Sequence, residues 1–293
     1  MNSKAAAQDG KGTGIPDLAA AIRALGIGGA NVCIHSSLRS FRVGLDCGAE
    51  GIIDAFLSQG CTIMVPTFSD IYAAKPVERY MPENNGAGDY SFFLNRAYPP
   101  TEPFDVSSRE LSPEKMGAFP KCVLAHEGSV RGDHPLNSFT ALGRNAQALA
   151  GCQTGRDVYA PFAWLCANGG YVLLMGVGLT SATILHYAEQ AAGRTPFVRW
   201  SRDRAGNVIP VSVGSCSRGF DHFRSILDPC AKHMTVGGSK WVCWKAADMV
   251  ALCSAAIRND PQITHCGDRY CDRCNDAVRG GPVLDPDFWE LPV

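Results

Sequence analysis

The stretch GYVLLMGVGLTSATILHYAE, residues 170–189, holds a strand, a turn and a helix in succession. Its apolar start predicts a buried strand, its two glycines predict a turn, and the Thr-Ser pair that follows can cap a helix. His186 and Glu189 are three residues apart, so they share one face of that helix. They can be ordinary polar residues of a helix, a pair of metal ligands, or a general base beside the carboxylate that orients its ring.

Outward from this stretch, helical and strand patterns alternate along the chain. Apolar periodicity predicts early helices near residues 16–25 and 52–57, and strands in NVCIHSSLRSF and TIMVPTFSD. TPFVRW and VIPVSVGSCSRGF have the pattern of antiparallel strands. This alternation is typical of an α/β fold with a largely parallel sheet. A final helix is expected in KAADMVALCSAAIRND, with a buried stripe formed by Ala246, Met249, Val250, Cys253 and Ile257.

The length and composition indicate one large domain. The chain has 293 residues, of which 46% are hydrophobic. We expect a flexible lead-in at residues 1–14, an α/β domain at 15–260, and an irregular cysteine-containing tail at 261–293 that packs on the domain. Residues 72–115 have no clear period and are rich in Pro, Asn, Gly and Tyr, which predicts a long functional loop or lid.

Charge and hydropathy exclude several kinds of partner. The net charge is −1 and no basic stripe is present, so we expect no nucleic-acid partner. No apolar run approaches the roughly 20 residues of a membrane span, and the N-terminus lacks the apolar core of a secretory signal. We therefore expect a soluble cytoplasmic protein, a monomer or homodimer, that acts on a small molecule. Most of its 13 cysteines are then expected to be reduced, buried apolar side chains.

Polar residues gather where the predicted strands end, in residues 35–37, 67–70, 131–138 and 180–189. Ligand sites of open α/β sheets collect at such ends. The serines of the HSS turn can donate hydrogen bonds to a phosphate or an oxyanion, and Asp70 can attract a cationic substrate. The alternative is that these residues are polar side chains satisfied by the backbone or by solvent.

The tail contains a possible metal site. Cys271 and Cys274 have the C-x-x-C spacing of a chelating pair, and His265 lies just upstream. Tetrahedral zinc needs four ligands, and Cys216 can supply the remaining one from a distant turn. The expected group is therefore one structural zinc; the alternative is a reduced surface C-x-x-C pair.

Five pieces of the chain, taken in order, resemble the aminoglycoside 3-N-acetyltransferase family. The most specific is VLLMGVGLTSATILHYAE, and the others are IHSSLRSF, MVPTFSD, VRGDHPLNSFTALG and VGGSKWVCWKAADMVALCSAAI. The tail THCGDRYCDRCNDAVR is similar to that of the branch that modifies apramycin and gentamicin. The resemblance implies a three-layer α/β/α fold around a central mixed sheet, unlike that of the GNAT acetyltransferases.

The resemblance also implies an activity and a set of site residues. It implies acetyl-CoA as co-substrate, His186 as catalytic base and Glu189 as the adjoining acid, with an aminoglycoside as acceptor. Asp70 and Tyr72 are the residues that we expect on the acceptor side. On the CoA side it places Ser36, Ser37, Leu38, Arg39, Arg131, His134 and Ser138.

The expected reaction is direct transfer of the acetyl group in a ternary complex, with His186 taking the proton of the amine. The turn VSVGSCSRGFD has no carboxylate before Asp221, so another amine metabolite of natural-product biosynthesis stays open as acceptor. Two other hypotheses remain. One is a zinc-dependent amidohydrolase with His35, His134 and His186 as ligands, and the other is a non-enzymatic module of a biosynthetic or resistance complex.

Overall fold

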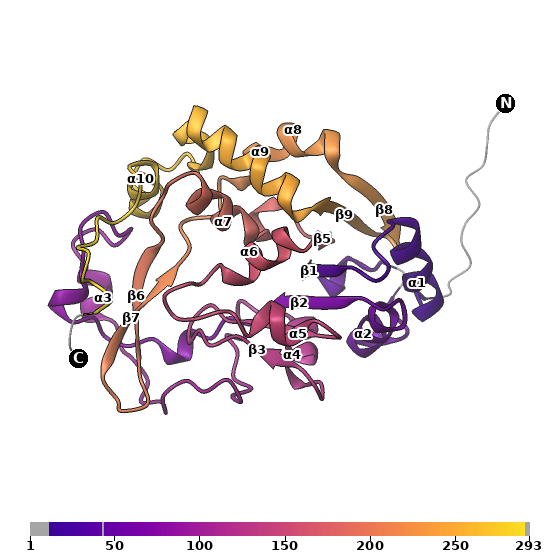
Figure 1. Cartoon of the computed structure of the whole chain (residues 1–293), viewed down its shortest axis with the longest axis horizontal. Coiled ribbons are helices and arrows are strands. Elements are labelled where there is room, and N and C mark those ends of the chain that lie inside the picture. The colour runs from indigo at the N-terminus through magenta and orange to yellow at the C-terminus, as the bar shows by residue number, and fades with distance from the viewer. Residues whose placement is uncertain (1–11, 43, 291–293) are drawn as a thin grey trace.

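The computed structural model describes residues 12–42 and 44–290, and its centre is a seven-stranded mixed sheet (Figure 1). The central strand β1 is parallel to its neighbours β2 and β5, and the outer pairs are antiparallel. The predicted α/β fold with a central mixed sheet is confirmed, whereas the largely parallel sheet expected from the alternation of helices and strands is wrong, because only the two pairs formed by β1 are parallel. In spatial order the strands are β3 (Val130–Arg131), β4 (Phe139–Leu142), β2 (Thr62–Pro66), β1 (Asn31–Ser36), β5 (Tyr171–Met175), β9 (Ser239–Lys245) and β8 (Lys232–Val236).

Helices cover both faces of the sheet, and the alternation of side chains along each strand divides the core between them. In β1, Cys33 enters one core, whereas Val32 and Ile34 enter the other. The first core lies under α5 (Ala146–Ala150), α6 (Ala160–Ala167), α7 (Ile184–Ala191), α8 (Arg224–Leu227) and α9 (Ala246–Asn259). The second lies under α1 (Ile15–Ala24), α2 (Gly48–Ser58) and α4 (Ala118–Ala125).

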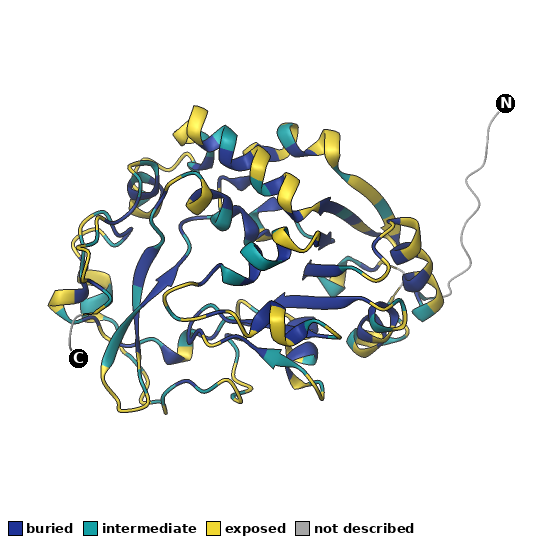
Figure 2. Ribbon diagram, in the orientation of Figure 1, coloured by how far each residue is buried: buried dark blue, intermediate teal, exposed yellow. Residues whose placement is uncertain are grey.

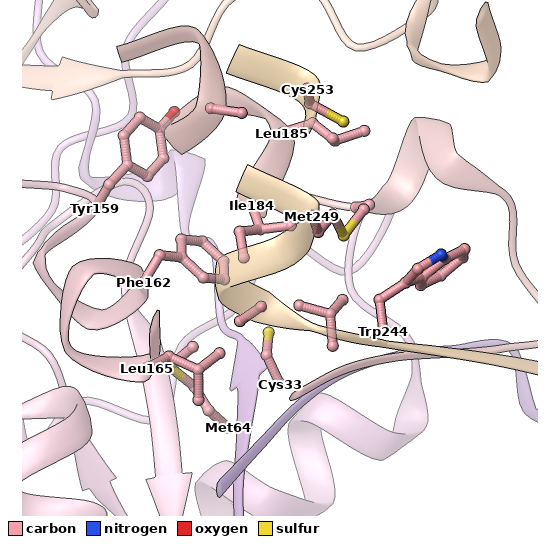
Figure 3. Packing of buried hydrophobic residues seen from close by; sticks show 14 of the residues in the cluster. Cys33, Met64, Tyr159, Phe162, Leu165, Ile184, Leu185, Trp244, Met249 and Cys253 are labelled. Carbon is pink, nitrogen blue, oxygen red and sulfur yellow. The ribbon is translucent and has the colours of Figure 1, made fainter. Parts of the chain in front are cut away.

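The first core is the one on which the candidate site rests. Figure 3 shows Met249 and Cys253 of α9 packed among Phe162 of α6 and Leu185 of α7. The stripe predicted for the final helix is therefore buried, except that Val250 is only partly buried. A helix α7 packed in this way holds its side chains in fixed positions at the sheet edge.

A two-stranded antiparallel sheet, β6 (Phe197–Arg202) with β7 (Val208–Val213), stands beside the central sheet, as the sequence pattern predicts (Figure 1). Trp200 of β6 packs edge-to-face on Tyr90 and Phe93, so the hairpin carries the loop at 72–115 on one side. In Figure 2 the two strands of this hairpin are dark blue over part of their length and teal over much of the rest, so the hairpin is buried in part.

The loop at 72–115 is anchored at two places, and it contains the short helix α3 (Ser91–Asn95). Asn85 exchanges hydrogen bonds with the backbone of Val198, and the backbone N–H of Gly86 donates to Asp276 Oδ2 at 2.8 Å. The second anchor is Arg131, whose contacts are described below.

The two chain ends differ from the expected flexible lead-in and irregular tail. Residues 1–11 lie outside the described residues, but Thr13 is buried and forms a parallel bridge with Leu45. The tail contains the helix α10 (Asp272–Val278), so it is not irregular throughout. Across residues 12–42 and 44–290, the structure has no helix of the length and apolar character that a membrane span requires.

Candidate active site

A cleft of about 1040 Å³ opens at the end of the sheet where β1, β2 and β5 terminate. Its other walls come from residues 86–98 of the long loop, from β6, from the turn after β7, and from the start of α10. Its position agrees with the rule that ligands of α/β sheets bind beyond the carboxyl ends of the strands. His186, near the start of α7, lines this cleft.

His186 and Glu189 form the pair that their spacing predicts. Nδ1 of His186 donates to Glu189 Oε2 at 2.7 Å, since a carboxylate accepts only. This bond assigns the proton of the neutral ring to Nδ1 and leaves Nε2 as an acceptor. In the described part of the chain no group bonds to Nε2, so the open nitrogen of His186 is available to a ligand in the cleft.

Glu189 is buried, with 4% of its surface exposed, and both of its oxygens are bonded. Arg194 Nη1 donates to Oε1 at 2.6 Å, and the hydroxyl of Ser215 donates to Oε2 at 2.6 Å. Burial alone would raise the pKa of Glu189, but the hydrogen bonds and charges of His186, Arg194 and Ser215 together hold it below its usual 4.5. The carboxylate is therefore ionised beside the imidazole at neutral pH.

Packing fixes the plane of the His186 ring. Tyr159 stacks on it with the ring centroids 6.3 Å apart, and Phe220 lies at 4.7 Å. At Gly214 a Cβ atom would approach both His186 Cδ2 and the Tyr159 hydroxyl to 2.7 Å, so only glycine leaves room for the ring there. Hence the ring is positioned by contacts on several sides as well as by the carboxylate.

Ser36, at the end of β1, is the member of the predicted CoA set that lines the cleft. Its hydroxyl oxygen is buried and has no hydrogen-bond partner among the described residues. Buried hydroxyls are nearly always bonded, so this one fits a ligand group. The neighbouring Ser37, Leu38 and Arg39 do not line the cleft.

The structure contradicts a direct contact of Arg131, His134 and Ser138 with CoA. Nδ1 of His134 accepts two backbone N–H groups, and Nε2 donates to Ser212 O at 2.7 Å. Ser138 and Arg131 are buried and bonded to each other. The remaining bonds of the guanidinium go to Ser108 O, Thr67 O, Ser69 Oγ and Glu110 O. Arg131 anchors the long loop through Ser108 and Glu110, whereas His134 and Ser138 bond to residues outside that loop.

The two residues expected on the acceptor side do not share one position. Asp70 lines the cleft, where it forms a salt bridge with Lys115. Tyr72 lines a neighbouring cavity of about 370 Å³ and bonds to Ser108. Asp70 is therefore already neutralised, and Tyr72 does not reach the main cleft.

Four cysteines gather beside the cleft, with their sulfur atoms all within 4.8 Å of one another: Cys216, Cys266, Cys271 and Cys274. His265 is not among them, which corrects the sequence-based set. Its Nε2 bonds to Asn275 at 3.1 Å, and its Nδ1 accepts the backbone N–H of Gly267. The four thiols suit a structural Zn²⁺, which binds four thiolates in tetrahedral geometry.

One thiol of this cluster is poised to ionise. Burial raises the pKa of Cys271, but hydrogen bonds from the Cys274 backbone, Arg218 and the neighbouring thiols outweigh it and lower the pKa to about 7. In the described residues no other His, Cys, Asp or Glu group has metal-binding geometry. His35, His134 and His186 are thus not gathered into the metal site that an amidohydrolase would need.

Several residues of the site were missed from the sequence. Ser215 and Arg194, which hold Glu189, and Tyr159, which stacks on the imidazole, carry no local signal. Cys266 is adjacent to His265, and sequence spacing does not decide which of two adjacent residues is a ligand. Except for Arg194, which follows α7 directly, these side chains come from separate segments that only the fold brings together.

The geometry defines an α/β protein with a carboxylate-held imidazole at the edge of a large cleft. The family model for aminoglycoside 3-N-acetyltransferase matches residues 33–257, and the chain belongs to this family.

Curated relatives include aminoglycoside N(3)-acetyltransferase VII of Streptomyces paromomycinus, 42% identical over 79 residues, which cover 26% of this chain and 27% of the relative. Aminoglycoside N(3)-acetyltransferase III of Acinetobacter baumannii is 30% identical over 187 residues, 61% of each chain. The matched stretches thus span from about a quarter to three fifths of these relatives.

Solved structures show the same fold. Aminoglycoside acetyltransferase AAC(3)-IVa superposes with a TM-score of 0.71 at 22% identity, over 92% of this chain and 98% of that chain. AAC-IIIb, solved with CoASH, gives a TM-score of 0.65 at 22% identity, over 84% and 96%. The fold is therefore that of this family and not that of the GNAT acetyltransferases.

Proposed function

We propose that the chain is an acetyl-CoA-dependent N-acetyltransferase that transfers the acetyl group directly to a primary amine in a ternary complex. The observation that carries this proposal is the arrangement of His186, with Nδ1 bound to Glu189 and Nε2 open to a cleft of about 1040 Å³. The family supports the reaction class. A related structure holds CoASH, and a variant of AAC(3)-IVa is in complex with a gentamicin, so aminoglycosides are the first acceptors to test.

The mechanism needs a base, because an aliphatic amine is protonated and unreactive at neutral pH. The ammonium first releases one proton to solvent, and Nε2 of His186 then accepts a second proton from the nitrogen as it attacks the thioester carbon. The new C–N bond forms, the C–S bond breaks, and the departing sulfur takes its proton from the imidazolium. Glu189 keeps the ring oriented and stabilises its charged form throughout.

Ser36 is placed to stabilise the oxyanion of the transition state. Its buried hydroxyl has no protein partner among the described residues and lines the same cleft as His186. A preorganised donor of this kind typically lowers the barrier by about 3 kcal/mol.

A structural zinc in the four-cysteine cluster completes the proposal. Four protein thiolates leave no open coordination position, so such a metal holds segments together and takes no part in the chemistry. It would join the turn after β7, through Cys216, to the start of α10, through Cys274.

The experiment that tests the function is a thiol-release assay on wild type and His186→Ala with acetyl-CoA and gentamicin or simpler amines. We expect kcat to fall about a hundredfold or more. Acetyl-CoA affinity, measured by calorimetry, should stay nearly unchanged. His233→Ala, at an exposed position on β8, is the matched control. Turnover of His186→Ala at the wild-type rate would remove the base from the mechanism, and activity lost on chelation with no need for acetyl-CoA would favour a hydrolase.

A further inference from the structure

The cleft carries more basic than acidic side chains. Its lining contains five basic residues, Arg96, Lys115, Arg199, Arg218 and Arg273, and three acidic residues, Asp70, Asp268 and Asp272. Two of the carboxylates are already paired, Asp70 with Lys115 and Asp268 with Arg218. This leaves three guanidinium groups facing one free carboxylate.

Arg199 is the most deeply placed of the three. Its Nη atoms donate only to the backbone carbonyls of Asn85, Gly86 and Val198. Its guanidinium lies 4.6 Å from the ring centroid of Phe93, which fixes its plane. No carboxylate of the described chain lies within salt-bridge distance of Arg199. Its positive charge is therefore stabilised by backbone carbonyls and an aromatic ring and has no counter-ion.

Arg96 and Arg273 reinforce this positive charge. Burial lowers the pKa of Arg199 to about 9, and the nearby charges of Arg273 and Arg96 contribute to that lowering, yet the group stays charged at neutral pH. Arg96 lies over the Tyr98 ring at 4.4 Å. Arg273 donates to the carbonyls of Gly214 and Ser215, the same segment that contacts the imidazole and Glu189. The three groups therefore lie near one another and line the same cleft as His186.

We propose that the acceptor amine of this chain carries an anionic group, a carboxylate or a phosphate, which binds Arg199, Arg273 and Arg96. A free polycation would bring more positive charge toward three guanidinium groups that have no salt-bridge partner, at a cost in binding. Arginine forks match the geometry of both anions. This inference rests on the proposed acetyl transfer and names its acceptor class. The phosphates of CoA offer the same chemistry, so the test must separate the two sources.

The experiment compares thiol release with γ-aminobutyrate and aminopropyl phosphate, with the neutral analogue aminopropanol, and with gentamicin. Wild type, Arg96→Gln and Arg273→Gln are assayed, with Arg79→Gln as control because that arginine also lies over a tyrosine ring but outside the cleft. We expect the anionic amines to give the highest kcat/KM. Both cleft variants should raise KM for the anionic amines about tenfold or more, and Arg96→Gln should do so with no change for aminopropanol or acetyl-CoA.

Each other result overturns the inference in a recognisable way. If the cleft variants raise KM for acetyl-CoA and leave the amines unaffected, the guanidinium groups bind a phosphate of CoA. If gentamicin gives the highest kcat/KM, the acceptor class is wrong while the acetyl transfer stands. If acetyl-CoA does not bind and no amine releases thiol, the proposed function fails and this inference fails with it.

Discussion

Nη1 of Arg194 donates a hydrogen bond at 2.6 Å to Oε1 of Glu189, the carboxylate oxygen that His186 does not bind. The same guanidinium donates to Thr264 Oγ1 at 2.7 Å and to Pro261 O at 2.6 Å. The carboxylate is thus fixed from behind by the segment that follows α9, and it cannot rotate away from the imidazole.

This arrangement predicts separate effects on stability and on activity. Glu189→Gln should lower kcat about a hundredfold or more, because the imidazolium loses its counter-charge. It should also lower the free energy of unfolding by about 3 kcal/mol, since the buried Arg194 guanidinium then has no carboxylate. Urea unfolding and initial rates measure the two effects.

The double variant Glu189→Gln with Arg194→Met separates the two roles. Removing both charges should restore most of the unfolding free energy while kcat stays low. Recovery of activity together with stability would mean that the pair serves only the fold.

A second prediction concerns the space beside the ring. Gly214→Ala would place a methyl carbon only 2.7 Å from Cδ2 of His186. We expect the imidazole to shift by a fraction of an ångström and kcat to fall about a hundredfold, as for other misplaced catalytic groups. Gly28→Ala, whose methyl would make only an ordinary van der Waals contact at 3.8 Å and whose backbone conformation suits any residue, should behave as wild type. A fully active Gly214→Ala enzyme would show that the position of the ring is not critical.

The third prediction tests the cysteine cluster. The purified protein should contain about one zinc per chain. Cys266→Ser and Cys271→Ser should lose the metal and have a lower Tm, whereas His265→Asn should keep the zinc content and the Tm of the wild type. Cys230→Ser, exposed and distant from the cluster, is the control. Metal retained in Cys266→Ser but lost in His265→Asn would restore the ligand set first expected from the sequence.

The fourth prediction is an acid sensitivity of the fold at His134. Burial lowers the pKa of His134 from 6.5 to about 4. Protonation at Nδ1 would also break the hydrogen bonds that this atom accepts from two backbone N–H groups. Between these pH values the unfolded chain binds a proton that the folded chain does not, so stability falls as pH falls. The expected loss at this site is about 3 kcal/mol, complete below pH 4.

Urea unfolding from pH 7 to pH 4 measures this slope. His134→Gln, whose amide can both accept and donate, should flatten it, whereas the exposed His233→Gln should not. An unchanged slope in His134→Gln would assign the acid sensitivity to other groups, of which His35 is one, since burial lowers its pKa to about 4 as well.

The sequence predicts the layers well, and it predicts the pair on α7, because both are local patterns. Continuous apolar runs identify β1, β2 and β5, and a spacing of three residues places His186 and Glu189 on one helical face. Such signals are contained within about ten residues and need no knowledge of the rest of the chain.

The roles of several other residues could not be predicted, because these roles depend on contacts between residues far apart in the sequence. Arg131 was expected to bind CoA, but the fold surrounds it with carbonyls from the long loop. Arg199 and Arg273 lie in different elements, and only the packing of β6 against α10 brings both to the cleft. Charge gathered in this way has no signature in sequence spacing.

The anchoring of the long loop, by Asn85 and Gly86 within its first half and by Arg131 near residues 108–110, has a consequence for the cleft that it borders. A wall tied down at two places needs no closure to complete the groove. Under the proposed function, an incoming amine therefore meets a receptor already in its final shape, and little of its affinity is spent on freezing the polypeptide.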